Sequence, residues 1–155
     1  MCEIAVVDPE RTSIEIAQQL AYTFYEEQQD GLGVLAVQDT GDKYEYESYK
    51  SIEPHWQTLY SFLKREWDES WRVIIHGRAG TSGGVKRGSA HPIHVDCEAC
   101  EFSHVIHNGS VRNWRQQRAS LISHGHEFTG SVDTEVIPHK IQEIPDSVEG
   151  LSYNT

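Results

Sequence analysis

Runs of apolar, β-branched residues alternate along the chain with segments whose apolar residues recur every three or four positions. The short apolar runs have the length and composition of strands. The predicted strands are residues 3–8, 31–39, 43–49, 71–76 and 102–107. Residues 43–49 alternate aromatic with charged side chains and follow the run 31–39 through Gly41, so these two segments are expected to form a hairpin.

Three other segments have the spacing of amphipathic helices. In the first, Ile16, Leu20 and Phe24 lie four residues apart on one face. Thr12 and Glu15 precede this face with the spacing of a capping box. We therefore expect a helix here whose apolar face packs against a sheet.

The second helix is predicted to begin after Pro54, because proline is favoured in the first turn of a helix. Its apolar stripe consists of Trp56, Leu59, Tyr60, Leu63 and Trp67. A stripe of this kind packs into the core. The third predicted helix spans residues 112–123, and its three arginines share a face that is expected to be solvated.

Length, composition and charge limit the class of protein. The 155 residues correspond to one domain, and the hydrophobic fraction of 37% is enough for a core. No apolar run approaches the ~20 residues of a membrane-spanning helix, and the N-terminus lacks the pattern of a signal peptide. Three cysteines favour a reducing compartment, so the expected location is cytoplasmic. The net charge of -11 opposes binding to nucleic acid or a membrane and favours small polar partners.

Polar, glycine-containing stretches follow two of the predicted strands, at residues 76–84 and 105–114. The second stretch contains Asn108 and Gly109, which offer a side-chain amide and an unobstructed backbone N–H, the two donors of an oxyanion hole. An Asn-Gly pair is also a common turn. Further along, Asp133 is suited to bind a cationic group or to cap a helix.

Cys2 directly follows the initiator methionine. Removal of Met1 would therefore leave a residue that carries both a thiol and a free α-amine. A thiol is a modest nucleophile at neutral pH, whereas an α-amine with a pKa of about 7.7–8.0 is a base poised close to that pH. The two groups together have the properties of an activated nucleophile.

Taken together, these stretches resemble the class II glutamine amidotransferases, and among them the glutaminase domain of glucosamine-6-phosphate synthase. The similar blocks are MCEI, DGLGVLAV, HGRAGTSGG, SAHPI, VIHNGSVRNW and GHEFTGSVDTEVIPH, from residue 1 to about residue 139. By this resemblance Cys2 is the nucleophile. Asn108 and Gly109 fall on the positions of the oxyanion hole.

The same resemblance implies the residues that bind the substrate. Arg78 and Thr81 fall at the site for the glutamine carboxylate, and Asp133 falls at the site for the glutamine α-amine. The chain departs from the family pattern at Glu3 and Ala79, where the relatives have glycine and tryptophan. The implied site therefore binds glutamine as a zwitterion, in a pocket that is looser than in those relatives.

The resemblance also implies an α+β fold of the N-terminal-nucleophile hydrolase type, an αββα sandwich of two antiparallel sheets with helices outside. Residues 1–155 are expected to form a single glutaminase-like domain with a short tail at 140–155. In the family further strands follow the helix after Asp133, so the sandwich is expected in a reduced or C-terminally truncated form. An open sheet edge predicts association with a second chain, either a copy of this one or a separate ammonia-accepting synthase subunit.

The expected function is hydrolysis of glutamine to glutamate, with the ammonia passed to a separate acceptor enzyme and with no cofactor. The alternative is a catalytically inactive amidotransferase-like domain that binds glutamine or serves as a structural subunit. Removal of Met1 distinguishes the two, because an unprocessed methionine blocks the α-amine.

A second group of candidate residues lies in the sequence between the two polar stretches at residues 76–84 and 105–114. Cys97 and Cys100 form a Cys-x-x-Cys pair, and His91 and His94 precede it, which together suffice for tetrahedral zinc. One such pair is only half of a zinc motif, and the family-like block around His91 already accounts for that histidine. We therefore expect no metal, with Cys97, Cys100, His91 and His94 as the alternative ligand set.

Overall fold

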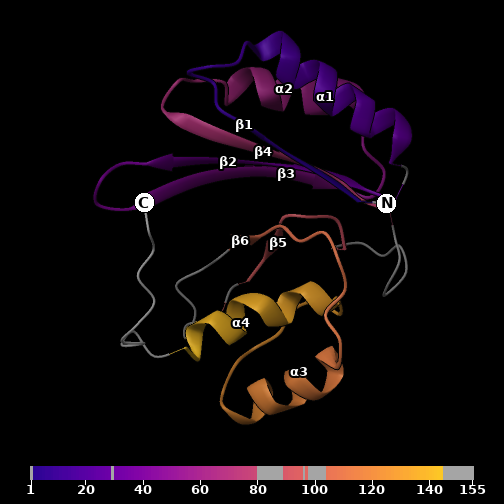
Figure 1. The fold of residues 1–155 in the computed structure, drawn as a ribbon, viewed down its shortest axis with the longest axis vertical. Coiled ribbons are helices and arrows are strands. Elements are labelled where there is room, and N and C mark those ends of the chain that lie inside the picture. The colour runs from indigo at the N-terminus through magenta and orange to yellow at the C-terminus, as the bar shows by residue number, and fades with distance from the viewer. Residues whose placement is uncertain (1, 29, 80–88, 96, 98–103, 145–155) are drawn as a thin grey trace.

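The computed structural model describes residues 2–28, 30–79, 89–95, 97 and 104–144. Within these ranges the elements are arranged in layers. In Figure 1, the helices α1 (Ile14–Glu27) and α2 (Trp56–Arg65) lie side by side on one face of a four-stranded sheet. A two-stranded sheet and two further helices lie on the opposite face. The chain is therefore an α+β protein.

The four-stranded sheet is antiparallel throughout, in the order β1-β4-β2-β3. Its strands are β1 (Glu3–Val7), β2 (Leu32–Asp39), β3 (Tyr44–Ser51) and β4 (Trp71–Gly77). The predicted hairpin is confirmed, because β2 pairs with β3 through a turn in which Gly41 has a φ of +86°. Glycine adopts this left-handed value without strain.

The core lies between the sheet and the helices α1 and α2. Its buried side chains are Val7, Ala17, Ala21, Phe24, Leu32, Val34, Leu59, Phe62, Leu63, Val73 and Ile75. The stripe predicted on the second helix is right for Leu59 and Leu63, but Tyr60 is exposed and Phe62 takes its place. The face of α2 that packs on the core is rotated slightly relative to the predicted stripe, so Tyr60 lies at the edge of this face and is partly exposed to solvent.

The first helix differs from its prediction in two respects. Its N-cap is Ser13, one residue beyond the expected capping box at Thr12. Ile16 is exposed, whereas Phe24 of the predicted face is buried together with Ala17 and Ala21, and Leu20 packs against the core. Small side chains allow the helix to approach the strands closely, which explains why the two alanines face inward.

The first strand is buried on one face only. β1 is an edge strand that pairs only with β4 in the four-stranded sheet of the described chain. Its side chains alternate between the two faces, so Val7 is buried against the helices while Ile4 and Val6 are exposed on the other face. Val6 reaches 69% exposure.

The layer below the sheet contains five short elements. They are β5 (Ile93–His94), β6 (His104–Val105), α3 (Trp114–Ser123), the 3-10 turn η1 (Asp133–Glu135) and α4 (Val136–Gln142). The strand predicted at residues 102–107 is confirmed only at His104 and Val105, and residues 102 and 103 lie outside the described ranges. None of the helices in the described ranges is both long and apolar enough to cross a bilayer.

The turn η1 is held in place by a buried carboxylate. Glu135 accepts hydrogen bonds from the backbone N–H groups of Thr129 and Gly130, at 2.6 and 2.9 Å. Arg118 Nη1 donates to the Gly130 carbonyl at 2.8 Å and lies 3.5 Å from the Glu135 carboxylate. The prediction that the arginines of α3 share a solvated face is therefore wrong for Arg118, which stabilises the loop before η1.

The segment before β5 lies directly against Gly33 of β2. A β-carbon on Gly33 would lie 1.6 Å from the carbonyl oxygen of His91, so the position accepts only glycine. On the neighbouring strand, Lys50 Nζ donates a hydrogen bond to the Pro92 carbonyl at 2.7 Å. These contacts fix the segment before β5 against the underside of the sheet.

Candidate active site

The pairing of β1 with β4 brings Cys2 next to the residues that follow β4. Glu3 pairs with Gly77, so the residue before β1 lies opposite the chain that leaves β4. The Cys2 thiol lies 3.3 Å from the Ala79 carbonyl oxygen, and the Ala79 N–H donates to the sulfur at 3.4 Å. The sheet therefore fixes the position of the thiol through backbone contacts.

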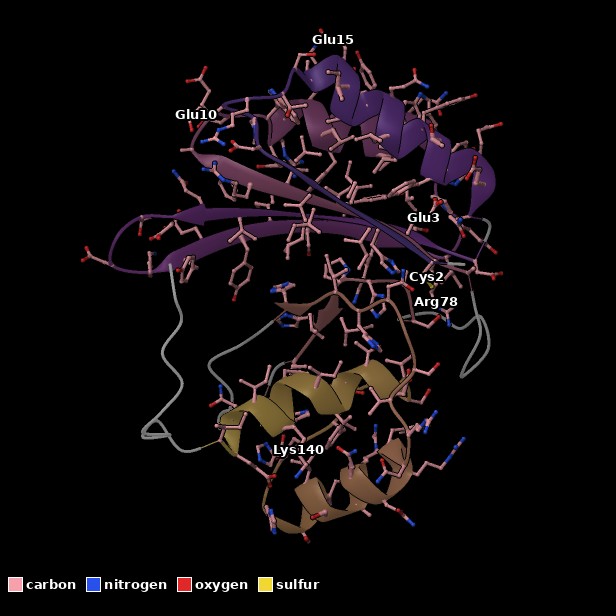
Figure 2. All side chains as sticks on the ribbon, in the orientation of Figure 1. Cys2, Glu3, Glu10, Glu15, Arg78 and Lys140 are labelled. Carbon is pink, nitrogen blue, oxygen red and sulfur yellow. The ribbon has the colours of Figure 1, made fainter. Side chains whose placement is uncertain are left out.

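Glu3, the departure from the family pattern beside Cys2, points away from the thiol. Adjacent side chains of a strand lie on opposite faces of the sheet. Figure 2 shows Glu3 on the side of α1 and Cys2 with Arg78 on the other side. The carboxylate of Glu3 is thus kept apart from the thiol.

The loop after β6 reaches Cys2 from 106 residues further along the chain. The Asn108 side-chain amide donates to the backbone carbonyl of Cys2 at 2.7 Å. Gly109 has a φ of +156°, and a β-carbon there would lie 2.8 Å from the Nε2 atom of His107. A side chain at position 109 would therefore displace the His107 ring.

Two buried groups of opposite charge lie beside the thiol. Arg78 follows β4 directly, and its backbone N–H donates to the Gly31 carbonyl at 2.8 Å. Asp133 begins η1, and its Oδ2 atom accepts a hydrogen bond from the Val111 N–H at 2.7 Å. The start of η1 and the end of β4 therefore bring a carboxylate and a guanidinium to the same pocket.

The pocket is lined by residues from both layers. The described residues that line it are Cys2, Arg78, Ala79, Ser89, His91, His107, Gly109, Val132, Asp133 and Thr134. Of the predicted site residues, four line this pocket, and Asn108 contacts Cys2 at its edge. Thr81 lies outside the described residues.

A row of hydrogen-bonding side chains adjoins the pocket and was not foreseen as part of the site. His76 Nε2 and His91 Nδ1 lie 3.1 Å apart, and His91 Nε2 lies 3.3 Å from the Thr134 hydroxyl. His107 Nδ1 lies 3.3 Å from the same hydroxyl. A neutral imidazole has one donor and one acceptor, so a neutral His91 donates to one of its two partners in the row and accepts from the other.

Two histidines of this row, His76 and His91, are neutral at pH 7. Burial lowers the pKa of His76 to about 4, and the charge of Arg78 adds to the effect. Burial also lowers the pKa of His91 to about 3, with further contributions from His76, His107, Arg78 and Lys50. Arg78 therefore brings its positive charge to a pocket whose neighbouring imidazoles His76 and His91 are uncharged.

The stability of the protein is expected to fall as the pH drops below the ordinary histidine value of 6.5. Because the folded-state pKa values of His76 and His91 are about 4 and 3, the unfolded chain binds more protons between pH 6.5 and 4. The resulting penalty is absent above this window and grows as the pH falls, by up to about 1.4 kcal/mol per pH unit for each histidine, or on the order of 7 kcal/mol for the two together at pH 4. Urea unfolding across the window measures the loss.

Two substitutions connect this loss to the buried row. His91→Gln keeps a hydrogen-bonding side chain but does not titrate, so it is expected to reduce the pH dependence of the unfolding free energy. His55→Gln removes an exposed histidine and is expected to leave the pH dependence unchanged. An unaltered slope in His91→Gln would contradict the assignment.

The alternative metal ligands considered from the sequence do not come together among the described residues. His91 belongs to the row beside the pocket, and the ring of His94 packs on that of His104 with centroids 4.8 Å apart. The histidines that lie near Cys97 are His126 and His139. Cys100 lies outside the described ranges.

Comparison with known proteins gives one family match. The family described as "Glutamine amidotransferase domain" matches residues 84–152. This range includes Asn108, Gly109 and Asp133, and it begins after Cys2 and Arg78.

Curated proteins similar to the chain are glutamine–fructose-6-phosphate aminotransferases. The one from Sulfurisphaera tokodaii is 33% identical over 150 residues, which cover 92% of this chain and 23% of the relative. That from Thermotoga maritima is 32% identical over 92% of this chain and 22% of the relative. That from Methanococcus maripaludis is 46% identical over 45% of this chain and 11% of the relative. The chain thus spans less than a quarter of the length of these three relatives.

Proposed function

Because the chain belongs to the class II glutamine amidotransferases, with a domain like that of the glutamine–fructose-6-phosphate aminotransferases, we propose that it hydrolyses glutamine to glutamate and supplies the ammonia to a separate acceptor enzyme. One observation carries this proposal. A cysteine thiol, a buried guanidinium and a buried carboxylate line the same pocket, at Cys2, Arg78 and Asp133.

Arg78 and Asp133 recognise the two charged ends of the amino acid. The planar guanidinium of Arg78 pairs with the substrate carboxylate through two parallel hydrogen bonds. The Asp133 carboxylate pairs with the α-ammonium group while its Oδ2 atom keeps the bond from the Val111 N–H. Amino acids that lack either charge are therefore expected to bind poorly.

Cys2 carries out the covalent step once Met1 has been removed. Its α-amine accepts the thiol proton, and the sulfur attacks the side-chain carbonyl carbon of glutamine. The tetrahedral adduct collapses as the C–N bond breaks, the nitrogen takes up a proton and ammonia leaves. Water then attacks the thioester, which releases glutamate and restores the thiol.

Asn108 and Gly109 stabilise the negative oxygen that forms in each of these steps. The Asn108 amide has two N–H groups, and one of them donates to the Cys2 carbonyl at 2.7 Å. The second is directed to the oxyanion together with the Gly109 backbone N–H. A donor held ready for charge that develops in the transition state commonly accounts for a rate factor of about 10²–10³.

The fold fits the same proposal. We assign residues 1–155 to a glutaminase-like domain of the N-terminal-nucleophile hydrolase type. The support is the order of layers in Figure 1, which runs from α1 and α2 through the two sheets to α4 and α3. The proposed partner is a separate ammonia-accepting synthase subunit, and a second copy of the chain is the alternative.

The function is tested on the protein purified with its natural N-terminus. Intact mass is expected to show that Met1 is absent, and incubation with glutamine is expected to release glutamate and ammonia in equal amounts. Protein that lacks Met1 and binds glutamine but releases no ammonia, alone or with its partner, would identify it as the inactive glutamine-binding domain instead.

Removal of the Asp133 charge is expected to weaken glutamine binding by roughly 2–4 kcal/mol, because the substrate ammonium loses its buried partner. Asp133→Asn is the suitable change, since the amide oxygen can still accept the bond from the Val111 N–H. Calorimetry in a Cys2→Ala background measures binding without turnover. Asp42→Asn, which neutralises an exposed aspartate, is the matched control.

Equal affinities of Asp133→Asn and Asp42→Asn for glutamine would rule out the role given to Asp133. Arg78→Ala is expected to weaken binding by a similar amount, through loss of the partner of the substrate carboxylate.

A further inference from the structure

Three buried side chains from separate parts of the chain converge outside the Cys2 pocket. Cys97 follows β5, His126 lies in the turn after α3, and His139 belongs to α4. Their side chains are almost inaccessible, at 8%, 7% and 0% exposure. None of the three is among the described residues that line the Cys2 pocket. The cluster is therefore a second place where nucleophilic and titratable groups gather.

The distances within the cluster fit a tetrahedral metal ion. His126 Nδ1 and His139 Nδ1 lie 3.2 Å apart, and Cys97 Sγ lies 3.9 Å from His126 Nδ1. The three atoms all lie within 4.8 Å of one another. Tetrahedral zinc, with bonds of about 2.0–2.1 Å to nitrogen and about 2.3 Å to sulfur, separates two nitrogens by about 3.3 Å and nitrogen from sulfur by about 3.6 Å.

The chemistry of the three groups selects the kind of metal. Thiolate and neutral imidazole are ligands of zinc, whereas calcium and magnesium take oxygen ligands. Among the described residues, the cluster includes no carboxylate.

We propose that Cys97, His126 and His139 bind a zinc ion. The ion joins the segment after β5 to the turn after α3 and to α4, and so stabilises the layer that carries Asp133. Water or a further ligand fills the fourth coordination position. This ligand set differs from the one considered from the sequence, which combined Cys97 with His91 and His94 and for which no metal was expected.

Metal analysis of the full chain, expressed without a histidine tag in zinc-supplemented medium and then dialysed, is the first test. About one zinc per chain is expected in the wild type and in Cys2→Ala, which excludes the thiol of the Cys2 pocket as a ligand. Exchange of zinc for Co²⁺ is expected to produce the visible absorption of tetrahedral cobalt and a thiolate-to-cobalt band in the near ultraviolet.

Single substitutions then identify the ligands. Cys97→Ser is expected to remove the thiolate-to-cobalt band, and His139→Gln to weaken Co²⁺ binding at least about tenfold. His124→Gln is the matched control, because His124 lies just after α3 but is exposed and pairs with Glu143. Absence of both zinc and the cobalt spectrum from the wild type and Cys2→Ala would overturn the proposal even if the Cys97 and His139 variants do not fold. A cobalt band that persists in folded Cys97→Ser would overturn it as well.

Discussion

Replacing Cys2 with alanine is expected to abolish glutamine hydrolysis, with a fall in kcat of at least ~10³-fold, because the reaction loses its nucleophile. The thiol lies at the meeting point of β1, the chain that follows β4 and the Asn108 amide. The described residues that line the pocket include one cysteine, Cys2. No second thiol among them can therefore replace it as the nucleophile. Glutamine binding, which depends on Arg78 and Asp133, is expected to persist.

The measurement compares ammonia release and glutamine binding in the same preparation. Ser61→Ala is the control, because it also removes a single heavy atom. The Ser61 hydroxyl donates to the Gln57 carbonyl within α2, and α2 lies on the face of the sheet opposite to the side on which Figure 2 shows Cys2. Cys2→Ala should bind glutamine without turnover, while Ser61→Ala should resemble the wild type. Residual turnover of Cys2→Ala near the wild-type rate would show that Cys2 is not the nucleophile.

Much of the upper layer was predictable because its information is local. The apolar run of β2, the aromatic alternation of β3 and the glycine between them are enough to define a hairpin. Which helix face turns inward was less predictable. Ile16 and Tyr60 are apolar enough to suggest burial, but the close approach of each helix to the sheet and to its neighbour decides which positions face inward.

Most residues of the candidate site could be proposed from the sequence, because they stand at the ends of strands or in motifs shared with a family. Cys2 and Arg78 lie close together because β1 and β4 pair antiparallel, with Glu3 opposite Gly77. Asn108 and Asp133 reach the same pocket from the lower layer. The residue types led to the hypothesis of glutamine hydrolysis, and the topology of the fold explains how residues distant in the sequence meet.

The histidine row and the Cys97 cluster were not predictable, since each depends on contacts between distant segments. His76 and His107 do stand at the ends of predicted strands, and this was the available signal. Nothing in the spacing indicates that Thr134 bridges two imidazoles. Likewise, the Cys-x-x-Cys pair drew attention to nearby histidines, whereas the fold brings His126 to within 3.9 Å of Cys97.

Gly33→Ala is expected to destabilise the protein by about 3 kcal/mol or more, which is the upper range for overpacking. The added β-carbon would lie 1.6 Å from the His91 carbonyl oxygen and 2.7 Å from its carbonyl carbon. Both are backbone atoms of the segment that leads into β5, so a change of side-chain rotamer cannot relieve the overlap. The segment would have to move away from the sheet.

A second strand glycine provides the matched control. A β-carbon on Gly77 would also be crowded, at 2.6 Å from the Cγ atom of Gln28, but this side chain can change its rotamer. The Cβ atoms of Gln28 and Phe24, at 3.1 and 3.2 Å, are relieved by a small shift of α1. Gly77→Ala is therefore expected to change the free energy of unfolding by less than about 1 kcal/mol, since alanine also orders a strand at lower entropic cost than glycine. Urea unfolding of both variants measures the difference.

The same displacement also predicts a functional effect in Gly33→Ala molecules that remain folded. His91 would be pulled out of line with His76 and Thr134, and the pocket wall that His91 forms would shift. Glutamine turnover is then expected to fall in Gly33→Ala under conditions in which the variant is fully folded, while Gly77→Ala retains activity. Equal stability and activity of the two alanine variants would contradict the prediction. They would mean that β2 is not so close to the His91 backbone that a β-carbon on Gly33 lies 1.6 Å from the His91 carbonyl oxygen.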